Sequence, residues 1–270
     1  MVDLFNFPYP AYEPNKIVAG ILAAIIGISL FLWIIQSIQS HFRPRRVIIL
    51  LLISHLTLFI ELILRATLSL DTRNTRAAFT VTTILLAVGQ RMIILANYDF
   101  LTQTGTLDSR VSRTIIIGSG LAIVSSAILI ASAGILSYNT DTIDTSFRLR
   151  QASAAIVLIM AILFYPIWFL IKTVKHMTKQ AILVLFISSI TSLIVTIYLM
   201  IISCPYYYVS TNQQEFWFYI FHFTPMAIAL VIWTILHPKR TLILTTQQQK
   251  DIKPDPMMIV REIRESKVPV

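Results

Sequence analysis

The chain has 270 residues, of which 56% are hydrophobic and only 13% are charged. An ordinary soluble domain is about 25% charged, so this composition excludes a typical soluble enzyme or binding domain. The net charge of +9 could suggest a nucleic-acid partner. However, the basic residues fall on alternate loops between apolar segments, which indicates membrane topology and excludes nucleic acid as the expected partner.

Seven apolar segments follow one another, each about 20 residues long and each ending at polar or basic residues. They are residues 17–38, 47–70, 77–101, 114–137, 152–171, 181–202 and 216–236. Roughly 20 helical residues rise about 30 Å, the thickness of the hydrocarbon core. Only helices and closed barrels satisfy their backbone in lipid, and these segments do not alternate as barrel strands do. The sequence predicts an all-α, seven-transmembrane helix bundle.

The basic residues gather on one side of this predicted bundle. The first, third and fifth loops and the C-terminal segment hold Arg43, Arg45, Arg46, Arg110, Arg113, Lys172, Lys175, Lys179, Lys239, Arg240, Lys250, Lys253, Arg261, Arg264 and Lys267. The opposite side holds Lys16, Arg73, Arg76, Arg148 and Arg150. The positive-inside rule places the richer side in the cytosol. We expect residues 1–16 to be an extracellular N-terminal segment, residues 17–238 the transmembrane domain, and residues 239–270 a flexible cytosolic tail.

The second and third segments carry charged residues at membrane depth. Glu61 and Arg65 are one helical turn apart, and Gln90 and Arg91 lie in the next segment. Each charge at the bilayer centre costs about 2.5–3.5 kcal/mol even on the lenient scale, which makes it a candidate for function. Glu61 and Arg91 are expected at similar depth, so Glu61 can neutralise Arg65 within its helix or Arg91 across helices, and cannot fully serve both. A bracing ion pair and a ligand-binding role are both open.

The seventh segment begins with Glu215, Tyr219 and His222, which fall near one helical face. Pro225 follows and is expected to kink the helix. A lone intramembrane histidine is commonly hydrogen-bonded packing, but the acid one turn earlier and the proline also favour a ligand-lining role. The predicted ligand-binding or translocation path comprises Glu61, Arg65, Gln90, Arg91, Glu215, Tyr219 and His222.

Motifs of other functional classes do not occur in the sequence. It contains no P-loop, no Gly-rich nucleotide fingerprint and no HExxH motif, and Cys204 is its one cysteine. The seventh segment has no lysine for a retinal Schiff base, and Asn97-Tyr98-Asp99 stands where rhodopsin-like receptors carry an acidic-Arg-aromatic motif. We therefore expect no catalytic residues, no metal site and no cofactor, and the protein is not predicted to be an enzyme.

The last apolar segment resembles the last helix of the fungal lipid-translocating exporter (RTA-like) family. It reads Glu215-Phe-Trp-Phe-Tyr219-Ile-Phe-His222-Phe-Thr-Pro225-Met226 and ends at His237-Pro238, whereas the family reads acidic, aromatic, Tyr, Phe, Asp, Pro-Met and then His-Pro. The Glu61-x-x-x-Arg65 spacing is similar to the second helix of that family, and Tyr9-Pro10 and Asn15 suit its opening. The resemblance implies seven spans with an outside N-terminus and ATP-independent movement or stress-linked handling of amphipathic lipids, such as sphingoid bases, sterol-like or porphyrin-like molecules.

The chain departs from that family pattern in three places. His222 stands where the family usually has Asp. Apolar residues around Val195, Leu199 and Ile202 replace the charged positions of the sixth helix, and residues 114–137 carry no charge where the fourth helix has acidic and amide positions. The chain is thus predicted to be a divergent member.

Two functional hypotheses follow from these features. The first is a translocator or handler of amphipathic lipids in the plasma membrane, with membrane lipids and an amphipathic small molecule as partners. The second is a seven-helix receptor or sensor whose basic loops and tail bind a cytosolic protein.

Overall fold

The computed structural model describes residues 14–104, 109–174, 177–211, 214–239 and 241, and within these ranges the chain is helical with no strand. The helices are α1 (Lys16–Gln39), α2 (Arg45–Thr67), α3 (Leu70–Arg73), α4 (Arg76–Thr104), α5 (Ser109–Leu136), η1 (Thr140–Thr142), α6 (Ile143–Val174), α7 (Lys179–Ile202), α8 (Pro205–Thr211), α9 (Glu215–Phe218), η2 (Tyr219–Phe223) and α10 (Thr224–Ile235). Most of the predicted N-terminal segment and C-terminal tail lie outside the described residues.

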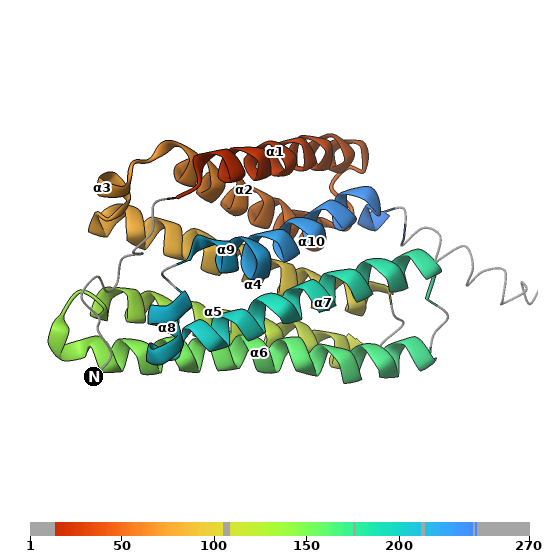
Figure 1. Cartoon of the computed structure of the whole chain (residues 1–270). Coiled ribbons are helices and arrows are strands. Elements are labelled where there is room, and N and C mark those ends of the chain that lie inside the picture. Colours follow the sequence, from red (N-terminus) through yellow and green to blue (C-terminus); the bar gives the residue numbers. More distant parts are fainter. Residues whose placement is uncertain (1–13, 105–108, 175–176, 212–213, 240, 242–270) are drawn as a thin grey trace, which may run out of the picture.

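Seven helical segments of the described chain are long and apolar enough to cross a membrane. The last of them is composite, because α9, η2 and α10 follow one another without a break. The predicted all-α, seven-helix membrane fold is confirmed. Figure 1 shows the long helices lying side by side, so that α1 begins at one end of the bundle and α10 finishes at the other.

The fifth span is longer than predicted. The apolar segment 152–171 lies inside α6, which begins at Ile143, so Arg148 and Arg150 are helical and not part of a loop. Asp144 in the first turn suits the positive end of the helix dipole. The window of apolar residues marks only the part of a helix that suits lipid, and the helix continues beyond it.

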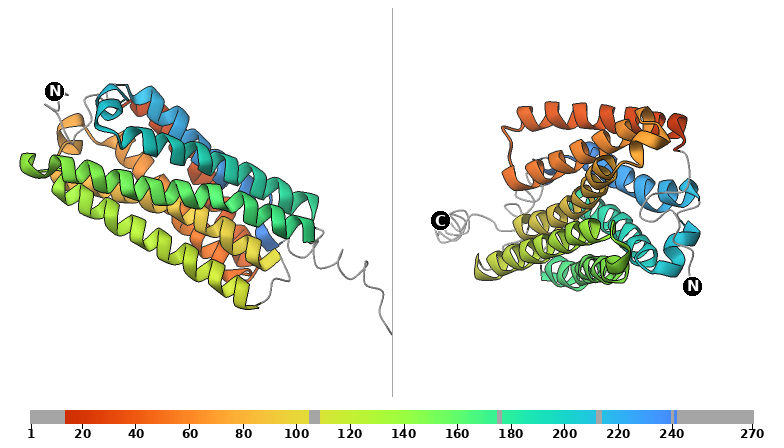
Figure 2. Two further views of the ribbon diagram at one scale, coloured as in Figure 1. Left: turned by 90° about the horizontal axis from the view of Figure 1, so that it is seen from below. Right: turned by 90° about the vertical axis from the view of Figure 1, so that its left-hand side faces the viewer.

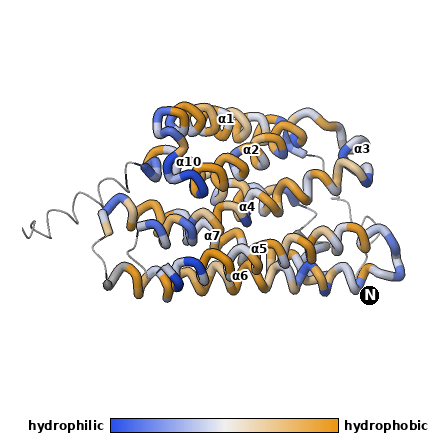
Figure 3. Tube along the Cα trace, turned by 180° about the vertical axis from the view of Figure 1, so that it is seen from behind, coloured by the Kyte–Doolittle hydropathy of each residue, from blue (hydrophilic) through white to orange (hydrophobic). Residues whose placement is uncertain are grey.

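The central helix of the bundle is α4, which packs against α2, α5, α6 and α7. Its second half is buried on nearly every side, whereas α5 buries only Ser119, Ile123, Ser126 and Ala133. The two views in Figure 2 show α1 and α2 on one side of α4 and α5 and α6 on the other. Large apolar side chains such as Leu121 on α5 are exposed, as expected of a surface in contact with lipid. Figure 3 shows that hydrophobic residues predominate along the long helices.

In the half of the bundle that contains the end of α10, several buried polar groups are hydrogen-bonded within the protein. His55 Nδ1 lies 2.8 Å from the carbonyl oxygen of Leu51, and its Nε2 lies 3.1 Å from Ser29 Oγ. The Trp233 indole donates to Ser188 Oγ at 3.0 Å, and the rings of Phe100 and Trp233 meet edge to face. Since these polar groups have protein partners, we interpret them as structural.

Gly89 allows the close approach of α2 and α4. Ser54 Oγ donates to the Gly89 carbonyl at 2.8 Å, and a Cβ atom at Gly89 would lie 2.8 Å from Thr57 Oγ1 and 3.2 Å from Met226 Cε. A Cβ atom at Gly118 on α5 would meet nothing within 4 Å. Both positions are helical, so alanine improves helix propensity equally, and the difference between them isolates the crowding.

We therefore expect Gly89→Ala to unfold at a lower temperature than Gly118→Ala in detergent. Crowding a packed interior costs about 1–3 kcal/mol, which corresponds to a gap on the order of 5 °C for a protein of this size. Equal melting temperatures for the two variants would contradict the tight α2–α4 contact.

Candidate functional site

A buried ion pair joins the second and seventh spans. Glu61 is 0% exposed, and Arg65 Nε donates to its Oε1 at 2.5 Å. Arg65 Nη1 lies 3.2 Å from Glu215 Oε1, and the guanidinium lies 4.0 Å from the centre of the Phe218 ring. The sequence left open whether Glu61 serves Arg65 or Arg91, and the structure assigns it to Arg65.

Glu215 also holds the beginning of the first span. Its Oε2 accepts the backbone N–H of Asn15 at 2.6 Å, and the Tyr219 hydroxyl donates to the Asn15 carbonyl at 3.5 Å. One carboxylate therefore ties α1, α2 and α9 together. Two residues of the predicted path, Glu215 and Tyr219, thus make contacts that organise the bundle.

Arg91 points the opposite way, toward α5 and α6. Its Nε donates to Ser126 Oγ at 2.8 Å, its Nη2 to Ser153 Oγ at 2.7 Å, and its Nη1 to the carbonyl of Ala87 at 2.9 Å. The side chain is 3% exposed, and all its hydrogen-bond partners among the described residues are uncharged. Arg91 is therefore a buried cation whose charge no described carboxylate balances.

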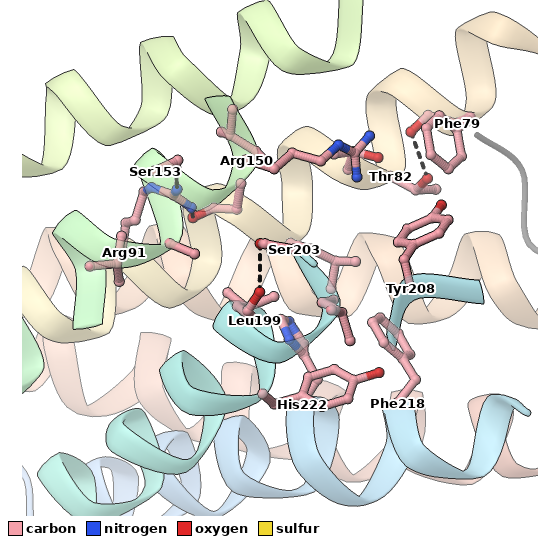
Figure 4. Close-up of a pocket in the computed structure, with 18 of the residues that line it drawn as sticks. Phe79, Thr82, Arg91, Arg150, Ser153, Leu199, Ser203, Tyr208, Phe218 and His222 are labelled. Atoms are coloured by element: carbon pink, nitrogen blue, oxygen red, sulfur yellow. Dashed lines mark hydrogen bonds between the residues drawn. The ribbon is translucent and has the colours of Figure 1, made fainter. Parts of the chain in front are cut away.

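A cavity of about 170 Å³ lies beside Arg91 (Figure 4). Its basic lining residues are Arg65, Arg73, Arg91, Arg150 and His222, and its apolar lining includes Leu86, Ile130, Val157, Leu199 and Ile202. No acidic residue is among the described residues that line it. Polar recognition groups on one part of an apolar wall are typical of small-molecule sites.

The cavity occupies the half of the bundle at which α1 begins. Its lining comes from the end of α2, from α3 and α8, and from the first halves of α4 and α6. Arg91 is about 22 Å along the 29-residue helix α4 from its first residue, which places it near mid-depth. Arg150 lies about two turns into α6, so the basic groups are spread from the end of the bundle to its middle.

The wall formed by the last span contains a π-helical turn. The N–H of Thr224 bonds to the carbonyl of Tyr219, five residues back, and η2 spans the residues between them. This wider turn stands directly before Pro225, at the position where the sequence predicts a kink, and π-turns are frequent at functional sites.

His222 on this turn faces the cavity (Figure 4). It is 1% exposed, and its ring stacks on Phe218 with a centroid distance of 5.1 Å and an angle of 8°. Neither ring nitrogen has a hydrogen-bond partner among the described residues. Buried polar atoms are rarely left without a partner, so the imidazole is available to a bound molecule.

The structure divides the predicted path into two groups. Arg65, Arg91 and His222 line the cavity, whereas Glu61, Glu215 and Tyr219 secure Arg65 and Asn15 from outside its lining. Gln90 is 1% exposed with no hydrogen-bond partner for its amide among the described residues, and it is not one of the lining residues.

Sequence reasoning missed Arg73 and Arg150, which it assigned to loops. The signal for Arg150 was its spacing with Ser153, Ala154 and Val157, since these four residues share one helical face and all line the cavity. Arg73 on the short helix α3 carried no such periodic signal.

Comparisons with protein-family models, with curated proteins and with solved structures give no match for this chain. The similarity to the lipid-translocating exporter family thus depends on the quoted motifs alone.

Proposed function

We propose that this multi-pass membrane protein binds an amphipathic lipid in the cavity and transfers or sequesters it without ATP, in the plasma membrane and with its N-terminus outside. The observation that carries the proposal is a cavity within the membrane-spanning helices that combines basic side chains with an apolar wall. An amphipathic molecule has the same two surfaces. No covalent step is invoked, and the protein acts in this proposal as a binder and not as an enzyme.

The cavity size favours binding of a head group over binding of a whole lipid. A cavity of about 150 Å³ holds one benzene molecule, so the 170 Å³ here accepts a head group and the first few carbons. The rest of the chain then stays between the helices or in the membrane. This arrangement suits transfer, because only the polar part of the lipid needs to be shielded from hydrocarbon.

Reconstitution into liposomes tests the transfer step. We expect the protein to accelerate the movement of fluorescently labelled amphiphiles between leaflets relative to empty vesicles, with no ATP added. Labelled sphingoid base, fatty acid and lysophospholipid form the panel. Rates equal to those of empty vesicles for all three would exclude transfer.

Close packing in the other half of the bundle favours a second candidate, a receptor or sensor. Trp33, Phe100 and Trp233 are fully buried there, so a ligand at Arg91 meets a packed core on that side. A ligand-dependent cytosolic protein, captured with the full chain and lost when Lys172, Lys175 and Lys179 are neutralised, would favour this function over transfer.

A further inference from the structure

We propose that the head group recognised in the cavity is an anion, a carboxylate or a phosphate, and that it binds as the counter-ion of Arg91. This inference rests on the proposed function only in taking the ligand to be an amphiphile in this cavity. It adds the sign of the charge on the ligand and identifies Arg91 as the residue that binds this charge.

The first support is the contrast between Arg65 and Arg91, the two buried arginines of the second and third spans. Arg65 is matched by Glu61 and Glu215, whereas Arg91 meets only serine hydroxyls and backbone carbonyls. A guanidinium has five N–H groups, and the bonds of Arg91 leave one N–H of Nη1 without a partner among the described residues. An unbalanced charge in an apolar region is costly, so an external anion there is strongly favoured.

The second support is the chemistry of the cavity around Arg91. Arg91 lies on the cavity wall and no described lining residue is acidic, so the part of the cavity next to Arg91 favours negative ligands. A guanidinium also binds the planar oxygens of carboxylate and phosphate in a bidentate manner. A sphingoid base carries an ammonium group and would meet like charges. The lining thus argues against the sphingoid base, which is the cationic one among the lipids that the family resemblance implies.

The third support is His222, whose ring faces the cavity without a hydrogen-bond partner among the described residues. A neutral imidazole carries one N–H donor, which can contact an anion that Arg91 holds. The apolar side chains of Leu86, Ile130 and Val157 line the same cavity and suit the first carbons of an attached chain. The ligand is therefore expected to need both a charge and a chain.

The test measures equilibrium binding to the purified full chain in a neutral detergent. The probes are dodecyl phosphate, dodecanoate, dodecanol, dodecyltrimethylammonium and inorganic phosphate. We expect one or both anionic amphiphiles to bind at least about tenfold more tightly than dodecanol, because a hydrogen bond to a charged group corresponds to a factor of that size. The ammonium probe should bind most weakly of the chain-bearing probes.

The preference for anions should depend on Arg91. Arg91→Gln is expected to reduce the affinity for the anionic probes to that for dodecanol, and Arg91→Lys to retain part of it. Arg113→Gln is the matched control, since Arg113 is exposed on α5 and the same charge is removed away from the cavity. Each variant is compared with the wild type by thermal unfolding, so that lost binding is separated from lost structure.

Three results would overturn the inference. They are equal affinity for dodecanol and the anionic probes, an anion preference that persists in Arg91→Gln, and inorganic phosphate binding as tightly as dodecyl phosphate, which would indicate a free-anion site. Failure of the proposed function can be distinguished from failure of this inference. Anion-selective binding without movement between leaflets removes only the transfer step, and transfer without anion preference removes only this inference.

Discussion

Replacing Glu61 by glutamine is expected to lower the melting temperature by roughly 6–12 °C. Breaking a buried pair by removing one partner costs about 3–5 kcal/mol, and a protein of this size loses about 2–4 °C per kcal/mol. These two figures together span roughly 6–20 °C. We expect the lower part of that span, because Glu215 still faces Arg65 at 3.2 Å and is only 10% exposed. Thermal unfolding in detergent gives the measurement.

A double-mutant cycle identifies the partner of Glu61. The structure predicts a coupling above about 1 kcal/mol between Glu61 and Arg65, which are in contact, and none between Glu61 and Arg91. The melting temperature of Glu215→Gln is measured alone and in combination with Glu61→Gln. Since both acids share one guanidinium, removing both should cost more than the sum of the single changes. Coupling to Arg91 with none to Arg65 would contradict the observed pairing.

The Glu61–Arg65 contact could be predicted from the sequence because it is local. Two residues four apart in a helix lie on the same face whatever surrounds the helix, and the seven spans are equally local signals of length and polarity. The direction of Arg91 is different. Adjacent residues Gln90 and Arg91 point about 100° apart, so which of them reaches a given neighbour depends on the rotation of α4. Packing against α5 and α6 decides that rotation, and one sequence does not reveal it.

The basic residues that line the cavity could not be identified from the sequence for a related reason. Charged residues beyond an apolar window resemble loop residues, so Arg150 was counted toward topology and not toward a site. In the structure it is helical and lines the same cavity as Arg91 and His222, which come from two other spans. Whether residues from three spans meet at one cavity depends on tertiary packing. From the sequence, the rise per helical residue gives only the approximate depth of each residue.

Arg65 and Arg91 show two uses of the same side chain in the buried interior of the bundle. Arg65 is enclosed by Glu61, Glu215 and the Phe218 ring, so it braces the bundle. Arg91 is held in position by neutral groups beside a cavity, so its charge is stabilised less than that of Arg65. Residues that serve binding are commonly retained at the expense of stability, and the two arginines should therefore differ in what their removal does.

Arg91→Met is accordingly expected to leave the melting temperature unchanged or to raise it. Ser126 Oγ still donates to the Ile123 carbonyl at 2.9 Å and Ser153 Oγ to the Ser126 carbonyl at 2.7 Å, so the substitution removes a buried charge without isolating its former partners. Replacing buried ions by apolar residues of similar volume stabilises by up to about 1–4 kcal/mol in known cases.

Arg65→Met is the matched control, because the same chemical change there leaves Glu61 and Glu215 facing no guanidinium from position 65. We expect it to cost about 3–5 kcal/mol, like the removal of either partner from a buried pair. The two variants should therefore shift the melting temperature in different directions, while Arg91→Met alone keeps the fold and loses the preference for anionic amphiphiles. A loss of stability in Arg91→Met as large as that in Arg65→Met would show that Arg91 is a bracing residue, and its uncharged partners would then have to be sufficient to stabilise its charge.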